Sequence, residues 1–414
     1  MTRAPEALRE LARAAVEASD AQLIKLVRAV DALPERGAVD ALLQPVRERL
    51  RALQPRRPLN LPRLLFLPLD PLVVAPRDWR PGAGQVPRSA IAPLAAALAA
   101  SVPGLAAEIG VRLAGHGVDA VHLIGREGTR LWQAGAAFDP RGPVPGWGDT
   151  GLSDAAHVEI LALARAVWRH AGGLWRLRLE GPRGPPVSLA RDVLREAAAE
   201  GPPMLGLALT VTMPFAAQPS RLAMVAAGLT CAVRQGGGPA VPPALVAEQA
   251  LDRVIAALDP GLGSGGLGSV AQAAERLAGL IEDLQATATP GQPARGGRLR
   301  SLRHAAAQSC LRHLEGEAGG KLALSFGAIA QAPELTDAAV AGLEASMTAL
   351  RSLADAARRL DHAAAAEAAL RPAIATLHAL LPGLPATGAG LRRSDALRLL
   401  ELLEGPEGAA SLVS

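Results

Sequence analysis

The sequence Gly-Leu-Gly-Ser-Gly-Gly at 261–266 matches the pattern G-x-G-x-x-G through Gly261, Gly263 and Gly266. Glycines at this spacing let the backbone approach a pyrophosphate at the N-terminus of the following helix. A dinucleotide site also requires a β-strand before the first glycine. Residues 244–260 have the spacing of an amphipathic helix instead. We therefore favour a linker between two helices over a dinucleotide site, and we predict no cofactor.

A metal site is the second candidate, because one predicted helix near 298–315 carries His304, Cys310 and His313. Cys310 and His313 are three residues apart and thus neighbours on a helix face, whereas His304 points elsewhere. Zinc is bound by three or four converging ligands, and no second Cys/His pair lies nearby in the sequence. We expect a buried thiol, two surface histidines and no metal.

Ser153, Asp154 and His157 are the three residue types of a hydrolase triad. They fall within one helical turn, which is too local for such a triad, and Ser153 is well placed to cap a helix. The motif G-x-S-x-G is absent and the chain has no tyrosine. Acid–base catalysis would depend on carboxylates, most of which lie opposite leucine stripes on solvated faces. An enzyme with a site that the sequence does not reveal is our third-ranked function.

Two arginine-rich stretches, 47–63 and 295–312, could contact phosphate groups. The guanidinium group suits phosphate recognition, and phosphate contacts dominate affinity for nucleic acid. Aromatic residues for base stacking are not interleaved with these arginines. A solvated, arginine-rich helix face in a lysine-poor chain is the interpretation we favour. The arginines are Arg47, Arg49, Arg51, Arg56, Arg57 and Arg63 in the first stretch, and Arg295, Arg298, Arg300, Arg303 and Arg312 in the second.

The composition of the 414 residues excludes several protein classes. Half of the residues are apolar, which is enough for two or three folded domains. The 43 cations nearly balance the 39 anions, so the pI near 9.9 overstates the positive charge. Two cysteines cannot form a disulfide framework. The near-absence of residues with AT-rich codons suggests a GC-rich genome of bacterial type.

No targeting or membrane segment is evident in the sequence. The first twenty residues alternate charged and apolar residues and lack the apolar core of a secretory signal. The longest apolar run, Met204–Ala217, is shorter than the ~20 residues that span a bilayer. We therefore expect a cytoplasmic protein without a transmembrane segment.

A proline-rich apolar stretch from Arg56 to Trp79 organises the chain. Its prolines argue against both a continuous helix and a central strand, so we predict an extended, polyproline-like segment, the strap, at about 58–76. The strap is too apolar to remain in water, and we expect it to lie buried across the helices, with coverage by a partner as the alternative. Its large apolar residues are Leu61, Leu64, Leu65, Phe66, Leu67, Leu69, Leu72, Val73 and Val74.

Most of the remaining chain has apolar residues at helical spacing. Residues 117–134 are ambiguous because two glycines weaken a helix there. Residues 174–180 alternate apolar and charged side chains, which is the best strand signal in the chain. No partner strand is visible, so an isolated extended segment and a helix end both stay open. The glycine run at 236–238 indicates a domain boundary.

The C-terminal part has the most regular pattern, with apolar steps of four and three between 336 and 361. Two heptads are too few for a coiled coil, so this helix is expected inside an antiparallel bundle. We predict a mainly α-helical protein with irregular helical domains followed by this bundle. The predicted domains are 1–57, a helical unit; 58–235, the strap with an irregular helical domain; and 240–414, the C-terminal bundle.

Helical patterning without converging polar residues favours a non-catalytic interaction or scaffold protein that acts on a protein partner. A nucleic-acid-associated protein that uses the arginines at 47–63 and 295–312 is the alternative. The residues that we expect in such contacts are Arg56, Arg57, Arg63, Phe66, Trp79, Arg298, Arg300 and Arg303.

Overall fold

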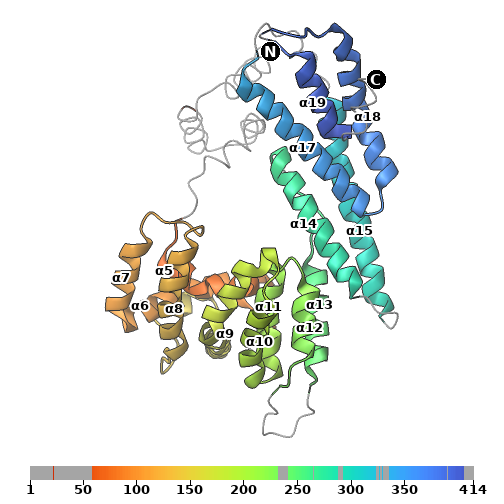
Figure 1. Ribbon diagram of the computed structural model, residues 1–414. Helices are drawn as coiled ribbons and strands as arrows, with labels where there is room; N and C mark the ends of the chain where they lie inside the picture. Colours follow the sequence, from red (N-terminus) through yellow and green to blue (C-terminus); the bar gives the residue numbers. More distant parts are fainter. Residues whose placement is uncertain are drawn as a thin grey trace, which may run out of the picture.

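The computed structural model describes residues 22, 58–231, 241–263, 265–287, 292–322, 326, 329, 335–388 and 390–404. The described part is mainly helical, which confirms the predicted fold class (Figure 1). The first helical group contains α5 (Leu61–Phe66), α6 (Ile91–Ser101), α7 (Pro103–Leu113), α8 (Val121–Ala137), α9 (Asp154–Glu180), α10 (Val187–Ala199), α11 (Pro202–Thr212), α12 (Pro219–Ala227) and α13 (Pro243–Ala257). The second helical group contains α14 (Leu267–Ala286), α15 (Pro293–Leu314), α17 (Asp337–Arg359), α18 (Ala363–Leu380) and α19 (Arg393–Glu404).

Shorter elements connect these helices. The 3₁₀ helix η2 (Leu67–Leu72) follows α5 directly, and η7 (Met213–Phe215) follows α11. Strands β1 (Val73–Val74) and β2 (Val86–Pro87) form a two-stranded parallel sheet. Among the described helices, no single one is both long and apolar enough to cross a membrane; α6 and α7 meet that test only as a pair bent by 117°.

The strap is buried, as expected, but the prediction that it is extended is wrong. Residues 58–76 form mainly α5 and η2, and β1 is its short strand. Pro62 and Pro68 lie in the first turns of α5 and η2, where a missing backbone N–H costs no helical hydrogen bond. The side chain of Asn60 caps α5 by accepting a 3.0 Å hydrogen bond from the backbone N–H of Arg63.

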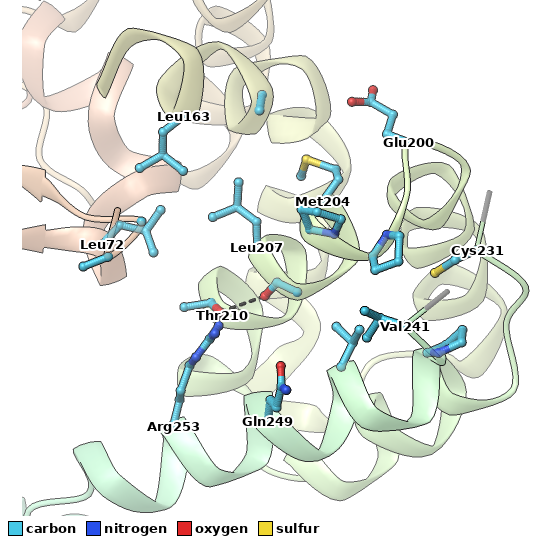
Figure 2. A pocket seen from close by; sticks show the side chains of 18 of the residues that line it. Leu72, Leu163, Glu200, Met204, Leu207, Thr210, Cys231, Val241, Gln249 and Arg253 are labelled. Carbon is cyan, nitrogen blue, oxygen red and sulfur yellow. Dashed lines mark hydrogen bonds between the residues drawn. The ribbon is translucent and has the colours of Figure 1, made fainter. Parts of the chain in front are cut away.

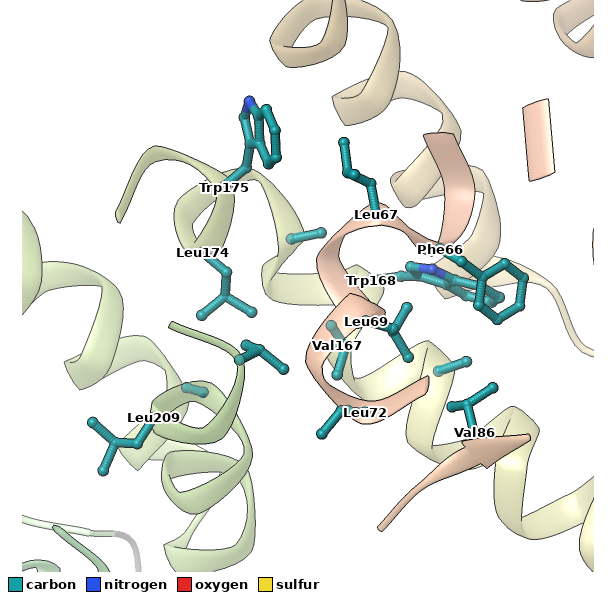
Figure 3. Packing of buried hydrophobic residues seen from close by; sticks show 14 of the residues in the cluster. Phe66, Leu67, Leu69, Leu72, Val86, Val167, Trp168, Leu174, Trp175 and Leu209 are labelled. Carbon is teal, nitrogen blue, oxygen red and sulfur yellow. The ribbon is translucent and has the colours of Figure 1, made fainter. Parts of the chain in front are cut away.

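The apolar side chains of the strap lie in the core of the first helical group (Figure 3). Phe66 is only 2% exposed, and its ring lies edge-on to Trp168 of α9 with the centroids 5.5 Å apart. Leu69 and Leu72 of η2 are also buried, with Val167 nearby on α9. This intramolecular packing is the favoured of the two predicted states of the strap.

Polar side chains of α8 and α9 bind the backbone of the strap as well. A helix end leaves carbonyl groups without partners, and such groups are costly to bury unless they accept hydrogen bonds. Here indole and guanidinium groups from distant parts of the chain donate to three carbonyls of the strap, of which the Leu64 carbonyl also accepts from the backbone N–H of Leu67. The bonds run from Trp132 Nε1 to the Leu64 carbonyl (3.0 Å), from Trp168 Nε1 to the Leu65 carbonyl (2.8 Å) and from Arg178 Nη1 to the Leu67 carbonyl (3.0 Å).

Among the helices of the first group, α8 and α9 contact each other most extensively. The ambiguous stretch 117–134 is largely helical, since α8 begins at Val121. Gly135 of α8 has a structural role there, because a Cβ atom would lie 2.8 Å from the Trp168 ring. Residues 174–180 are the end of a helix, the second of the two possibilities left open for them, because they complete α9. Their buried side chains follow a helical spacing against neighbouring elements, which local alternation cannot reveal.

Two hydrophobic clusters divide the described chain. The first cluster includes the buried face of α13, for example Val246 and Val254, together with Leu284 and Leu299 of the second helical group. The second cluster begins at Leu262. The domain assignment stays a prediction, but these clusters favour a boundary at 258–266 over the glycine run at 236–238.

Charged residues join the two helical groups. Arg295 of α15 is nearly inaccessible, with its side chain 3% exposed, and it pairs with Glu248 and Asp252 of α13. The Asp283 carboxylate of α14 accepts hydrogen bonds from the hydroxyl (2.5 Å) and the backbone N–H (2.9 Å) of Ser220. Ser220 lies in the first turn of α12, where an anion is favourable because of the helix dipole.

Helix α17 lies at the centre of the second group and contacts α14, α15, α18 and α19. Its predicted apolar seam is buried in the second cluster. The antiparallel bundle itself stays a prediction. The seam residues are Leu343, Met347, Leu350, Ala354 and Ala357.

Replacing Phe66 with alanine should lower the free energy of unfolding by roughly 3–5 kcal/mol, because the change leaves a cavity against Trp168. Urea denaturation measures the effect as a lower midpoint at an unchanged slope. Phe138→Ala is the matched control, since Phe138 is only partly buried and should cost less. A loss below about 1 kcal/mol for Phe66→Ala would contradict burial of the strap.

Candidate functional site

The glycines at 261–266 do not form a dinucleotide site of the expected kind. Helix α13 ends at Ala257, so a helix and not a strand precedes them. The backbone N–H of Leu262 donates to the Ser309 hydroxyl at 3.3 Å, and the Leu262 side chain is buried. These contacts fit a linker between α13 and α14.

The predicted metal ligands do not converge. Cys310 is fully buried on α15, and burial raises the pKa of its thiol to about 11. The His304 ring lies near that of His362, with the centroids 5.3 Å apart, rather than near Cys310 or His313. Within the described part of the chain, no group of three or more metal-ligating side chains occurs.

The residues of the suspected triad have structural roles. The Ser153 hydroxyl accepts a hydrogen bond from the backbone N–H of Ala156 and so caps α9, as predicted. His157 is buried against Trp147, with the ring centroids 4.7 Å apart. Burial lowers the pKa of His157, although Asp154 acts to raise it. The imidazole is therefore a neutral packing group in the core.

The arginines at 295–312 have separate environments. Arg295 pairs with α13, and Arg303 pairs with Asp361 at 2.8 Å. Arg298 and Arg300 are exposed and form no ion pair within the described chain. They are two residues apart and thus point to different sides of α15. The cluster is therefore not one continuous basic surface.

The predicted site residues near the strap are also separated. Arg56 and Arg57 lie outside the described residues. Arg63 is partly exposed on α5, whereas Phe66 is buried and unavailable to a partner. Trp79 is partly buried, and its indole donates to the Gln85 carbonyl at 3.2 Å.

A groove of about 1280 Å³ opens beside the C-terminal end of the strap (Figure 2). Helix α11 forms its floor through Met204, Leu207 and Thr210, which are spaced three residues apart and lie in one row. Helices α9 and α13 both pack against α11 and lie on either side of this row. The groove is therefore a trough between helices.

The walls of the groove are mainly apolar. Leu163 of α9 and Leu72 of η2 contribute one wall, with Val74 of β1 beside them. Val246 and Gln249 of α13 contribute the other wall. These residues lie far apart in the sequence, and only the packing of α9, α11 and α13 brings them together.

Two charged residues line the groove, one near each end (Figure 2). Glu200 is bound by Arg169 at 2.5 Å and His170 at 2.8 Å. Burial acts to raise the pKa of Glu200, but these hydrogen bonds outweigh it and the pKa lies below its ordinary value. At the other end, Arg253 Nη1 donates to the Thr210 hydroxyl at 3.1 Å, and Arg253 has no carboxylate partner among the described residues.

No local sequence pattern indicated the groove. The apolar run around α11 indicated burial on all sides, yet Leu207 is only partly buried. Arg253 followed the ordinary pattern of a polar helix face. Its position at the groove depends on α13 packing against α11, which no local pattern specifies.

No family model, curated protein or solved structure matches this chain.

The two cysteines should differ in their reactivity, because only one of them lines the groove. Cys231 lines the groove and is half-buried, and burial raises the pKa of its thiol. In the native state a thiol reagent should modify Cys231 alone, faster as the pH rises, because only the thiolate reacts. Cys310 should react after denaturation. Cys231→Ser should remove the native reaction and Cys310→Ala should retain it; equal reactivity of both thiols in the native protein would contradict this arrangement.

Proposed function

We propose that this chain is a non-catalytic interaction protein that holds an apolar segment of a protein partner in the groove. The observation that carries the proposal is a large trough with a mainly apolar lining on the surface of the first helical group. Exposed apolar patches of this kind mark binding sites in soluble proteins.

The size of the groove favours a polypeptide over a small molecule. Pockets for small ligands enclose about 300–1,000 Å³ and bury most of the ligand surface. The groove exceeds this range and runs between helices instead of enclosing a cavity. A peptide segment would fill such a trough more completely than a metabolite.

The polar groups of the groove support binding better than catalysis. A nucleophile needs a base within hydrogen-bonding distance. Cys231 has a raised pKa, and Glu200 is held by Arg169 and by a hydrogen bond to the His170 ring. Both cysteines are free thiols, which supports a reducing, cytoplasmic setting for the interaction.

Nucleic-acid binding is the second candidate function. Exposed Arg298 and Arg300, which lack carboxylate partners in the described chain, support it. The ion pairs of Arg295 and Arg303 weigh against it, because they reduce the positive charge available on α15.

A photo-crosslinking amino acid at Leu207 should capture one discrete partner, because this position lies on the groove floor. The same group at Val158, which is 67% exposed on α9 outside the groove, should not. Leu163→Glu should abolish the crosslink at Leu207 by placing a charge in the apolar wall, whereas Val158→Glu should retain it. The measurement is mass spectrometry of the crosslinked peptide, with circular dichroism to verify folding. Equal crosslinking from both positions would contradict the proposal.

For the second candidate, binding to a nonspecific DNA duplex is measured by fluorescence anisotropy at increasing salt. Phosphate contacts by Arg298 and Arg300 would give an affinity that falls with salt, with a logarithmic slope of about −0.9 per contact. The double variant Arg298→Glu, Arg300→Glu should then lose binding, whereas Arg77→Glu, at an exposed arginine of the first group, should not. No binding at low salt would exclude this function.

A further inference from the structure

We propose that the groove binds an amphipathic α-helix of a partner protein and that a carboxylate of this helix pairs with Arg253. The inference rests on the function proposed above and specifies the shape and charge of the occupant.

The shape of the groove fits a helix. Helix α11 lies along the floor, where Pro202, Pro203 and Gly206 line the groove beside Met204, Leu207 and Thr210. Helices α9 and α13 lie on either side of it as two walls (Figure 2). A helix laid along α11 would contact three helices at once, at the ordinary interaxial distance of about 8–10 Å. Peptides that bind in such troughs present side chains at positions i, i+3 or i+4, and i+7.

An extended segment fits less well. An added strand would need a sheet edge with several free backbone groups. Strands β1 and β2 contain two residues each, and β2 includes Pro87, which has no N–H to donate. A strand that pairs with this edge would gain few hydrogen bonds.

The apolar surface of the groove requires apolar residues on the face of the partner helix that lies against it. Leu163, Leu207 and Val246 come from three different helices and line the groove together. Leu163 and Leu207 remain partly exposed, so an occupant gains free energy by removing them from water. Leucine-sized side chains on the partner would meet them.

The charged residues of the groove indicate which polar residue the partner helix carries at one end. Of the two charged residues that line it, Glu200 is already paired with Arg169 and hydrogen-bonded to His170. Among the described residues, Arg253 binds only the Thr210 hydroxyl, through one of its five N–H donors. The remaining donors can bind a carboxylate in fork geometry. The partner therefore carries Asp, Glu or a chain terminus at the Arg253 end.

The experiment selects phage-displayed random peptides of about 16 residues, long enough for roughly 24 Å of helix, on the full-length chain. Parallel selections use Leu207→Glu and Leu163→Glu, which block the groove from two different helices. Peptides enriched on the wild type alone should have apolar residues at helical spacing and an acidic residue at one fixed position.

The strongest peptide is then synthesised with a fluorescent label, and its affinity is measured by anisotropy. Arg253→Glu should weaken binding roughly fivefold to tenfold, as expected for loss of one partly exposed ion pair. Replacing the acidic residue of the peptide with lysine should restore binding to Arg253→Glu. The matched control Arg300→Glu, at an exposed arginine outside the groove, should bind as the wild type does. Comparing the peptide as free acid and as amide distinguishes a side-chain carboxylate from a chain terminus.

The outcomes separate this inference from the proposed function. Enrichment that is equal on the wild type and on both groove variants would overturn the proposed function and this inference together. Groove-dependent peptides with alternating apolar residues would overturn the helical shape of the occupant. Groove-dependent peptides with unchanged affinity for Arg253→Glu would overturn the carboxylate. Either result would leave the proposed function in place. A concentration-dependent dimer that Leu207→Glu abolishes would make a second copy of the chain the occupant. If dodecanoate protects Cys231 from an alkylating reagent and no peptide does so, the occupant of the groove is a lipid chain and not a helix.

Discussion

The structure of the first helical group depends on the hydrogen bonds that bind the backbone of the strap. Carbonyls at the end of α5 are buried, and a buried carbonyl without a donor costs about 1–3 kcal/mol. The indoles of Trp132 and Trp168 and the guanidinium of Arg178 supply the donors from α8 and α9. The same residues pack against the strap, so burial and hydrogen bonding fix one position for it. Residues far apart in the chain therefore define a single core.

The groove is a consequence of this arrangement. The fixed strap holds η2 beside α9 and places Leu72 in one wall. On the other side, α13 approaches α11 closely at Gly206, where a Cβ atom would lie 3.3 Å from Val246. Helix α11 thus has a neighbour on each flank and an uncovered row between them. The apolar groove with Arg253 at one end supports the proposed binding of a helix.

Two of the five arginines of α15 form ion pairs with other helical segments, and one of them, Arg295, lies at the contact between the two helical groups. A buried guanidinium requires charged partners, because its desolvation is otherwise costly. Arg295 has Glu248 and Asp252, which lie more than forty residues earlier in the chain. Arg303 binds Asp361 in the second group. These arginines therefore connect helices, and the positive charge that the sequence suggested for nucleic acid is only partly available.

The sequence by itself determined the features that depend on local spacing and on composition. These are the helical fold, the burial of the strap, the Ser153 cap and the buried seam of α17. Only the tertiary structure decided that the strap is helical, because prolines break a helix or begin one according to where its first turn lies. It also decided that 174–180 completes α9, which arginines form ion pairs, and that Leu72, Leu163, Leu207 and Arg253 share one groove. The physical reason is that these outcomes depend on contacts between residues tens of positions apart, which period and propensity do not encode.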